Sequence, residues 1–265
     1  MKKKKIQLST IYLWVILALM YLPIIVIIVY SFNESKLSST WDGFSLTWYK
    51  QLFRDRAMGE ALINTLVLGF LSSAAAGIIG TLGAVGIPKA LLPGKGVIEY
   101  IVMLPMMTPE IILGMVSLTF FSLLSLPFGM TTLFLAHTAF CIPYVYMQVK
   151  ARLVGLDPSL LEAAKDLGAG EARAFFDITL PLISPAIVSG MLLAFAMSID
   201  DVIISVFVTG ASTTTLPIKI YTMLKTGVTP KINAMCTLMF AATLLIVVLS
   251  SLIGREKKPK QAKSK

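Results

Sequence analysis

Long runs without a charged residue dominate the pattern of hydrophobic and polar positions in this chain. Five such runs are 22 to 39 residues long: Ile6–Asn33, Ala61–Pro88, Ile111–Val149, Ile178–Ile199 and Ile232–Gly254. A helix needs only about 20 apolar residues to cross a bilayer. Because the hydrocarbon core offers no water to backbone polar groups, and because these runs far exceed the ~10 residues of a barrel strand, we expect membrane-spanning helices.

Dividing the longest run gives six spans. The sequence Leu126–Gly129 forms a turn, and Glu99 and Glu110 are each allowed inside a helix. The expected spans are 11–31, 61–87, 97–122, 131–149, 184–207 and 232–253. The chain is therefore predicted to be an all-α, polytopic membrane protein with six transmembrane helices.

Composition and charge agree with this class and orient the chain. Hydrophobic residues make up 56% and charged residues 14%, against about 25% charged in average soluble domains. The termini and the even-numbered loops carry 16 of the 23 lysines and arginines, so both termini should be cytoplasmic. Lys2–Lys5 and Arg255–Lys265 hold most of the net charge of +9. They are expected to be cytoplasmic anchors in contact with membrane lipid, not arms for nucleic acid.

Three smaller features have structural explanations. The first external loop, 32–60, contains Trp41, Trp48 and Tyr49, which suit an interfacial aromatic belt with a short surface helix or, alternatively, a docking surface. Glycines of the second span, Gly80 among them, should allow close helix packing. The only histidine, His137, is expected to be hydrogen-bonded within the bundle, and no metal or cofactor is expected.

The longest cytoplasmic loop, 150–183, has the pattern of two short helices. Asp157 can cap a helix that begins at Pro158 and ends at Gly168. Its apolar residues, Leu160, Ala164 and Leu167, share one face. A second segment follows Gly170, with Ala172, Phe175 and Phe176 on its apolar face, and should end at Pro181.

Seven residues of this loop lie at a fixed spacing before the penultimate span: Glu162, Ala163, Ala164, Gly168, Ile178, Leu180 and Pro181. They resemble, in type and spacing, the EAA signature of permease subunits of bacterial ABC importers. In that family the loop couples the permease to a separate ATPase. The small alanines would permit close approach, Glu162 would accept a hydrogen bond from the partner, and Gly168 would permit a sharp turn. The resemblance also implies the type I ABC importer permease fold.

A closer resemblance, to the permeases of spermidine/putrescine ABC importers, extends over nearly the whole chain. It rests on Tyr21–Ile25, Ser31–Asn33, Met106–Glu110, His137–Pro143, Glu162–Ala169, Asp200–Val202, Phe207–Gly210 and Leu216–Tyr221. Glu110 stands where the family usually has Asp. The resemblance leaves open whether spermidine, putrescine or another small solute is carried.

The resemblance implies a four-part importer in a bacterial cell membrane. Its other parts would be a second permease, two ATP-binding cassette ATPase subunits and an extracytoplasmic polyamine-binding protein. This chain lacks the G-x-x-x-x-G-K-[ST] phosphate loop, so it is not expected to be an enzyme. Its expected parts are 1–60 (tail, first span and external loop), a permease core at 61–253, and a basic tail at 254–265.

Three acids inside the spans are candidates for the substrate pathway. Glu110 should lie about 20 Å along the third span, near mid-depth, and Asp200 and Asp201 should lie toward the outer end of the fifth span. An intramembrane carboxylate usually faces a partner or a wet cavity. These three could therefore be transient counter-ions for a cation, or could serve in structural pairing and helix capping.

Two other functions compete with the importer. A secondary transporter could use such acids for ion coupling, but no inverted repeat is evident and the EAA loop would be unexplained. An intramembrane enzyme would need a metal-ligand set or an activated nucleophile, and the sequence has no such cluster.

Overall fold

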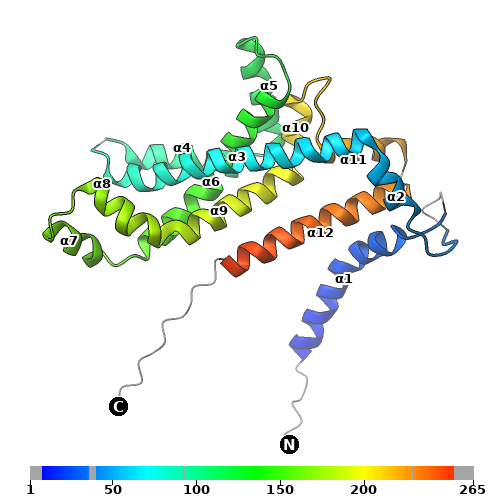
Figure 1. The fold of residues 1–265 in the computed structure, drawn as a ribbon, viewed down its shortest axis with the longest axis horizontal. Coiled ribbons are helices and arrows are strands. Elements are labelled where there is room, and N and C mark those ends of the chain that lie inside the picture. Colours follow the sequence, from blue (N-terminus) through cyan, green and yellow to red (C-terminus); the bar gives the residue numbers. More distant parts are fainter. Residues whose placement is uncertain (1–7, 36–39, 92, 228, 254–265) are drawn as a thin grey trace, which may run out of the picture. The chain divides into compact units, whose positions relative to one another are not determined.

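The computed structural model describes residues 8–35, 40–91, 93–227 and 229–253, and nearly all of them are helical (Figure 1). Among the described residues the only β pairing is a single antiparallel bridge between Asn33 and Phe44. The basic tails predicted as cytoplasmic anchors, Lys2–Lys5 and Arg255–Lys265, lie outside the described residues. The helices are α1 Leu8–Tyr30, α2 Thr47–Arg54, α3 Arg56–Lys89, α4 Lys95–Met107, α5 Glu110–Leu123, α6 Met130–Val154, α7 Ser159–Asp166, α8 Glu171–Ala174, a π-helical turn Phe175–Thr179, α9 Leu180–Asp200, α10 Ile203–Val208, α11 Leu216–Thr226 and α12 Pro230–Ile253.

Apolar helices cover the six predicted spans, although the third and the fifth are each divided between two helices. Four helical segments are long and apolar enough to cross a membrane: Ile11–Tyr30, Arg56–Lys89, Met130–Val154 and Glu171–Asp200. The third predicted span corresponds to α4 and α5, and the sixth to the apolar helix Pro230–Leu245. The large apolar side chains of α1, such as Trp14 and Leu19, are exposed, as expected for a surface that faces lipid.

The third span is broken, where the sequence predicted one continuous helix. The axes of α4 and α5 differ by 107°, and the break lies at Thr108 and Pro109. Thr108 is extended, with φ −90° and ψ 136°, because the residue before a proline is disfavoured in the helical region. Glu110 is consequently the first residue of α5, and the predicted position halfway along a straight helix is wrong.

Two compact units divide the chain, residues 1–60 with 219–242 and residues 61–218 with 243–265. In the first unit, the loop after α1 is folded upon itself. The indole of Trp48 donates to the carbonyl of Asn33 at 2.7 Å, and the Tyr49 hydroxyl is 2.7 Å from that of Ser31. The short surface helix predicted in this loop is α2, while the choice between aromatic belt and docking surface stays a prediction.

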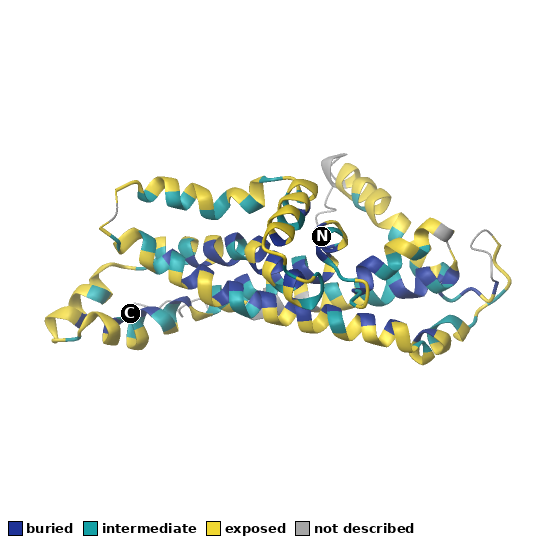
Figure 2. Cartoon of the chain, turned by 90° about the horizontal axis from the view of Figure 1, so that it is seen from above, coloured by how far each residue is buried: buried dark blue, intermediate teal, exposed yellow. Residues whose placement is uncertain are grey.

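The core of the second unit is the packing of α6 against α9, with α3 alongside (Figure 1). Small residues permit this approach. A Cβ added at Gly80 of α3 would lie 3.0 Å from the backbone nitrogen of Tyr146 in α6, and one at Gly77 would lie 2.8 Å from Met191 in α9. The predicted role of Gly80 in close packing is confirmed. In Figure 2 the buried residues gather on the inner helices, while the outer ribbons are mainly exposed.

Candidate functional site

The loop that follows α6 begins later than predicted, because α6 continues to Val154. The next helix, α7, starts at Ser159, one residue after the expected position. Asp157 precedes it, and its carboxylate accepts a hydrogen bond from the backbone N–H of Ser159 at 3.0 Å. This bond lowers the pKa of the Asp157 carboxyl below its ordinary value. Asp157 therefore satisfies one of the free donors at the start of α7, as the sequence predicted.

The predicted turn at Gly168 is present and has a defined geometry. Gly168 has a φ of +79°, a left-handed conformation that side chains with a Cβ rarely adopt. Its N–H bonds to the carbonyl of Lys165 at 2.9 Å, and the N–H of Ala169 bonds to that of Ala164 at 3.0 Å. This pair of bonds is the Schellman motif, so Gly168 reverses the chain between α7 and α8.

Most of α7 has no cover from the rest of the described chain. Ala164 is buried, but Glu162 and Ala163 are exposed. The predicted apolar face includes Leu160, which is exposed, and Leu167, which is 90% exposed. In Figure 2 this part of the chain is mainly yellow. The exposed acid, small residue and leucines together form a surface suited to contact with another protein.

The second short helix does not end at Pro181, and this prediction is wrong. The segment from Glu171 to Asp200 is one helical run, in which α8 passes through the π-helical turn into α9. The N–H of Leu180 bonds to the carbonyl of Phe175, five residues earlier. This wider turn ends at Thr179, and Pro181 follows as the second residue of α9, so the helix continues through the proline after the turn has changed the hydrogen-bond register. Phe176, on the predicted apolar face, is 62% exposed.

A cavity lies behind the loop, between its two helices and the end of α3. Its volume is about 320 Å³, and Lys89, Lys165 and Glu171 line it with apolar neighbours. Lys165 and Glu171 approach to 3.8 Å across it. This contact joins α7 to α8 beyond the turn at Gly168.

The three predicted pathway acids come together at the two helix breaks of the second unit. Glu110 begins α5, Asp200 ends α9, and Asp201 precedes α10, so the fifth predicted span, 184–207, is two helices instead of one. Helices α5 and α10 pack closely. The charges of Asp200 and Asp201 are near enough to Glu110 to interact with it. Asp200 is exposed and Glu110 is half-buried, so both carboxylates are accessible.

Asp201 differs from the other two acids because its carboxylate already has partners in the chain. Its side chain is 2% exposed, and it accepts hydrogen bonds from the backbone N–H groups of Ile204 at 3.1 Å and Ser205 at 2.8 Å. The Ser205 hydroxyl donates a third at 2.8 Å. Asp201 therefore caps α10, one of the alternatives that the sequence left open.

His137 extends this cap into a polar network. Its Nε2 lies 2.9 Å from the Ser205 hydroxyl and 3.3 Å from the Asp201 carboxylate. Its Nδ1 lies 2.8 Å from the hydroxyl of Ser198, which is 3.1 Å from that of Ser72. The network thus joins α3, α6, α9 and α10, and the predicted hydrogen-bonded role of His137 is confirmed.

Sequence reasoning missed the three serines of this network. Ser72 and Ser198 lie inside apolar runs, where a serine also satisfies itself by bonding to its own helix, as Ser72 does to the carbonyl of Leu68 at 2.6 Å. The signal that could have found Ser205 is its spacing of four residues from Asp201, since side chains four apart on a helix lie on the same face.

The helical bundle and its paired short helices define a permease of the type I ABC importer fold. A solved bacterial alginate ABC transporter has a chain that aligns over 93% of both chains with a TM-score of 0.71 at 19% identity. A MetNI methionine ABC transporter aligns with a TM-score of 0.64 over 76% of this chain and 98% of that chain, also at 19% identity. At this identity the likeness concerns the fold alone.

Sequence comparison defines the family. Residues 92–255 match the model of the binding-protein-dependent transport system inner membrane component, and the chain belongs to this family. It is 40% identical over 245 residues to the spermidine/putrescine transport system permease protein PotC of Haemophilus influenzae, covering 92% of this chain and 95% of that protein. It is 41% identical over 230 residues to the putrescine transport system permease protein PotI of Escherichia coli, covering 84% and 82%. The chain is accordingly a multi-pass membrane transport component.

Proposed function

We propose that this chain is a permease subunit of an ATP-driven importer, and that with a second permease it forms the membrane pathway for polyamines such as spermidine and putrescine. The observation that carries the cargo class is the position of Glu110, Asp200 and Asp201 at two helix breaks whose helices α5 and α10 pack together. The names of the relatives that are about 40% identical support the same class. A polyamine is an aliphatic chain with several ammonium groups, and carboxylates are the natural counter-ions for such a cation.

The three acids divide the work in this proposal. Glu110 and Asp200, whose carboxylates are accessible, meet the cargo in transit and lower the free-energy cost of removing water from an ammonium group. Asp201 holds α10 in place through its cap and adds its negative charge to the same region. Contacts of this kind hold a cation weakly enough to release it.

The EAA loop has the second role, which is coupling to a partner ATPase. Glu162, Ala163 and Ala164 with Gly168 form the docking part. Leu180 and Pro181 connect that part to the long helix α9. ATP hydrolysis belongs to two partner ATPase subunits, because the chain has no phosphate-binding loop. Docking at α7 would move the base of the Glu171–Asp200 segment when the ATPases close.

The remaining parts follow from this assignment. Both termini face the cytoplasm of a bacterial cell, residues 61–253 form the permease core, and an extracytoplasmic polyamine-binding protein delivers the cargo on the other side.

The complex reconstituted in proteoliposomes with ATP inside tests this function. We expect spermidine and putrescine to be taken up and to stimulate ATP hydrolysis, whereas a neutral sugar, an amino acid and a divalent cation should do neither. Stimulation by one of those other solutes, with no response to amines, would assign a different cargo. Uptake driven by an ion gradient through this chain without an ATPase would replace the importer with a secondary transporter.

A further inference from the structure

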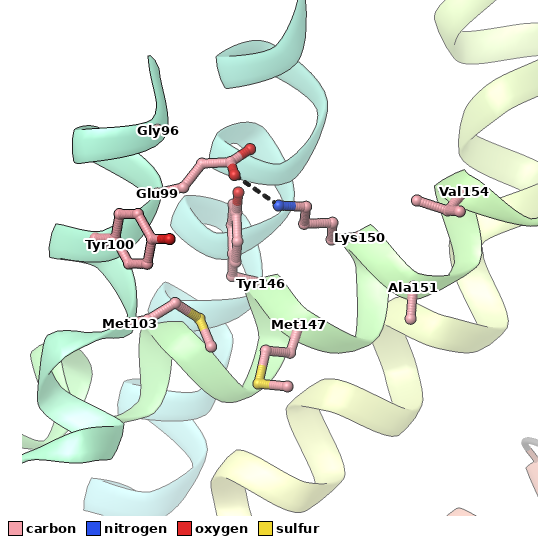
Figure 3. A pocket seen from close by; sticks show the side chains of 9 residues that line it. All are labelled: Gly96, Glu99, Tyr100, Met103, Tyr146, Met147, Lys150, Ala151 and Val154. Carbon is pink, nitrogen blue, oxygen red and sulfur yellow. Dashed lines mark hydrogen bonds and ion pairs between the residues drawn. The ribbon is translucent and has the colours of Figure 1, made fainter. Parts of the chain in front are cut away.

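A second acid site lies between α4 and α6, away from the three acids discussed so far. It is an open pocket with a volume of about 740 Å³ (Figure 3), within the usual range of small-molecule sites. Helix α4 contributes Glu99, Tyr100 and Met103, and helix α6 contributes Tyr146, Met147 and Lys150. Apart from one carboxylate and one ammonium group, the lining is aromatic and aliphatic.

The carboxylate in this pocket has one partner, and that partner can move. Lys150 Nζ lies 2.8 Å from Glu99 Oε2, and the two side chains are 39% and 32% exposed. The same ammonium group lies 5.6 Å from the centre of the Tyr146 ring. Because a partly hydrated ion pair contributes little stability and an aromatic face also attracts a cation, Lys150 could leave Glu99 and remain over Tyr146.

The Tyr146 side chain adds a polar group to the same place. In Figure 3 its hydroxyl points toward the Glu99–Lys150 pair. The tyrosine is buried, and its hydroxyl is close enough to the Glu99 carboxylate and the Lys150 ammonium group to interact with both. A ligand ammonium group bound at Glu99 would supply a donor for this oxygen.

The lining therefore matches an ammonium group carried on an aliphatic chain. Glu99 would pair with the charge, the faces of Tyr100 and Tyr146 would attract it, and Met103 with Met147 would cover the methylene groups. A phosphate or a carboxylate would meet Glu99 at close range, and a neutral sugar would find few hydrogen-bond partners.

We propose that this pocket is a transient polyamine subsite, in which Glu99 exchanges the Lys150 ammonium for an ammonium group of the cargo and Lys150 then displaces the cargo. This inference rests on the proposed polyamine function and adds a later step to it. On α6, Lys150 is six residues beyond Tyr144, which lies within electrostatic range of Glu110. Six residues correspond to about 9 Å along the helix. Lys150 is four residues before the end of α6 at Val154, on the predicted cytoplasmic side.

The Lys150 ammonium group would speed the release of a polyamine from Glu99. An unpaired carboxylate in an apolar pocket would hold a polyamine long enough to slow its release. A tethered lysine competes with the cargo at a high local concentration and needs no diffusion to return. The pair should bind cargo weakly and release it quickly.

The test uses the assembled complex in nanodiscs of phosphatidylcholine and phosphatidylglycerol, which contain no primary amine. A Met147→Cys substitution in a Cys236→Ser background places a thiol in the pocket, and the rate of maleimide labelling reports its occupancy. Spermidine should slow labelling at position 147 in a concentration-dependent way, but not at Leu91→Cys, an exposed position outside the pocket.

Two charge variants should then change the spermidine concentration needed for protection in opposite directions. Glu99→Gln should raise the half-protecting spermidine concentration by roughly tenfold, because one charge-assisted hydrogen bond is lost. Lys150→Gln should lower it by roughly tenfold and also slow single-turnover release, because the competitor is gone. Lys225→Gln is the matched control, since Lys225 also lies over a tyrosine ring, that of Tyr221 at 4.6 Å, and it should change neither quantity.

Shifts in the same direction for both charge variants, or no protection in a complex that imports polyamines, would overturn the subsite. Protection that appears only when phosphatidylethanolamine is added, and is insensitive to spermidine, would assign the pocket to a lipid headgroup and also overturn it. A wild-type complex that imports no amine would instead refute the proposed function itself.

Discussion

Two parts of the second unit differ in whether their side chains already have partners within the chain. Around His137, four helices share buried polar groups that are hydrogen-bonded to one another, from Ser72 to Asp201. At α7, by contrast, Leu167 and other apolar side chains are exposed to solvent. A satisfied interior fixes helix positions, whereas an uncovered apolar face has a free-energy gain still available from a partner. Substitutions should therefore affect stability in the first part and coupling in the second.

Gly168→Val should produce the largest effect, a loss of uptake to background. A β-branched residue in a left-handed conformation costs about 1–2 kcal/mol, and here the turn sets the angle between α7 and α8. The cause is backbone conformation and not space, because an added Cβ would meet nothing within 4 Å. Gly170→Ala is the matched control: Gly170 is equally open but has a φ of −66°, so uptake should be near normal. Membrane insertion, measured by protease mapping, should be unchanged in both variants.

Glu162→Lys should rank second and should reduce both ATPase co-purification and uptake by roughly tenfold or more, because it reverses a charge at the proposed contact. The exposed position of Glu162 means that the isolated chain should keep its melting temperature. Asp166→Lys makes the same charge change four residues later on α7 and should have a smaller effect, since a cation is favourable at a helix C-terminus. Normal ATPase association of the Glu162→Lys complex would contradict a docking role for α7.

Asp201→Asn should have the opposite effect to Glu162→Lys: it should lower the stability of the chain more than it lowers coupling to the ATPase. The amide keeps one oxygen acceptor but cannot accept every bond that the carboxylate does, which should cost about 1–3 kcal/mol. Thermal unfolding of the purified chain measures this cost, and Leu167→Ala, on the exposed face, should leave the unfolding temperature unchanged. Equal effects of the two substitutions on stability would remove the distinction between the two regions.

Glu110→Gln should be milder for stability than Asp201→Asn, because Glu110 is half-buried and not part of the network. Uptake normalised to assembled complex should fall by about threefold to tenfold, which is the range expected for one weakened charge-assisted contact. Unchanged normalised uptake in both Glu110→Gln and Asp200→Asn would show that these acids do not meet the cargo.

The smallest effect is expected at an ion pair in the first unit, where Lys231 Nζ lies 2.7 Å from Asp55 Oδ2. The hydrogen bond from Lys231 lowers the pKa of the Asp55 carboxyl below its ordinary value. Its stabilising contribution is therefore present above the ordinary carboxyl pKa and is lost as the pH falls through the lowered value. At pH 7, Asp55→Asn should destabilise by about 0.5 kcal/mol, the magnitude typical of a partly exposed pair. Unfolding measured at pH 7 and at successively lower pH should show the difference at pH 7 and its decrease as the pH falls through the lowered pKa of Asp55.

The sequence predicted the elements that depend on local pattern. Apolar runs placed the spans, and Gly168 with Asp157 marked the ends of α7, because charge-free length and capping chemistry act over a few residues. The effect of each proline on its helix was harder to predict. Pro109 and Pro181 are both preceded by helical sequence, yet one breaks a span and the other continues it, since a widened turn before Pro181 removes the steric conflict.

The candidate sites show the same division between local and distant causes. The EAA residues are contiguous, so their surface could be predicted. The pairing of Glu99 with Lys150 joins residues 51 positions apart, and the His137 network joins four helices. Such contacts depend on how helices pack, and no single stretch of sequence specifies that packing.

The π-helical turn Phe175–Thr179 has a consequence for the phase of the Glu171–Asp200 segment. A π turn holds one residue more than an α turn in the same length of helix, so it behaves like a one-residue insertion that the helix has absorbed. Deleting one residue there would restore a regular α-helix and leave α8 close to its present azimuth relative to α9, whereas a deletion within the regular part of α9 would rotate α8 by about 100°. The wide turn therefore lets the chain carry an extra residue while α9 keeps its neighbours in the bundle and the α7 surface keeps its orientation toward a docking partner.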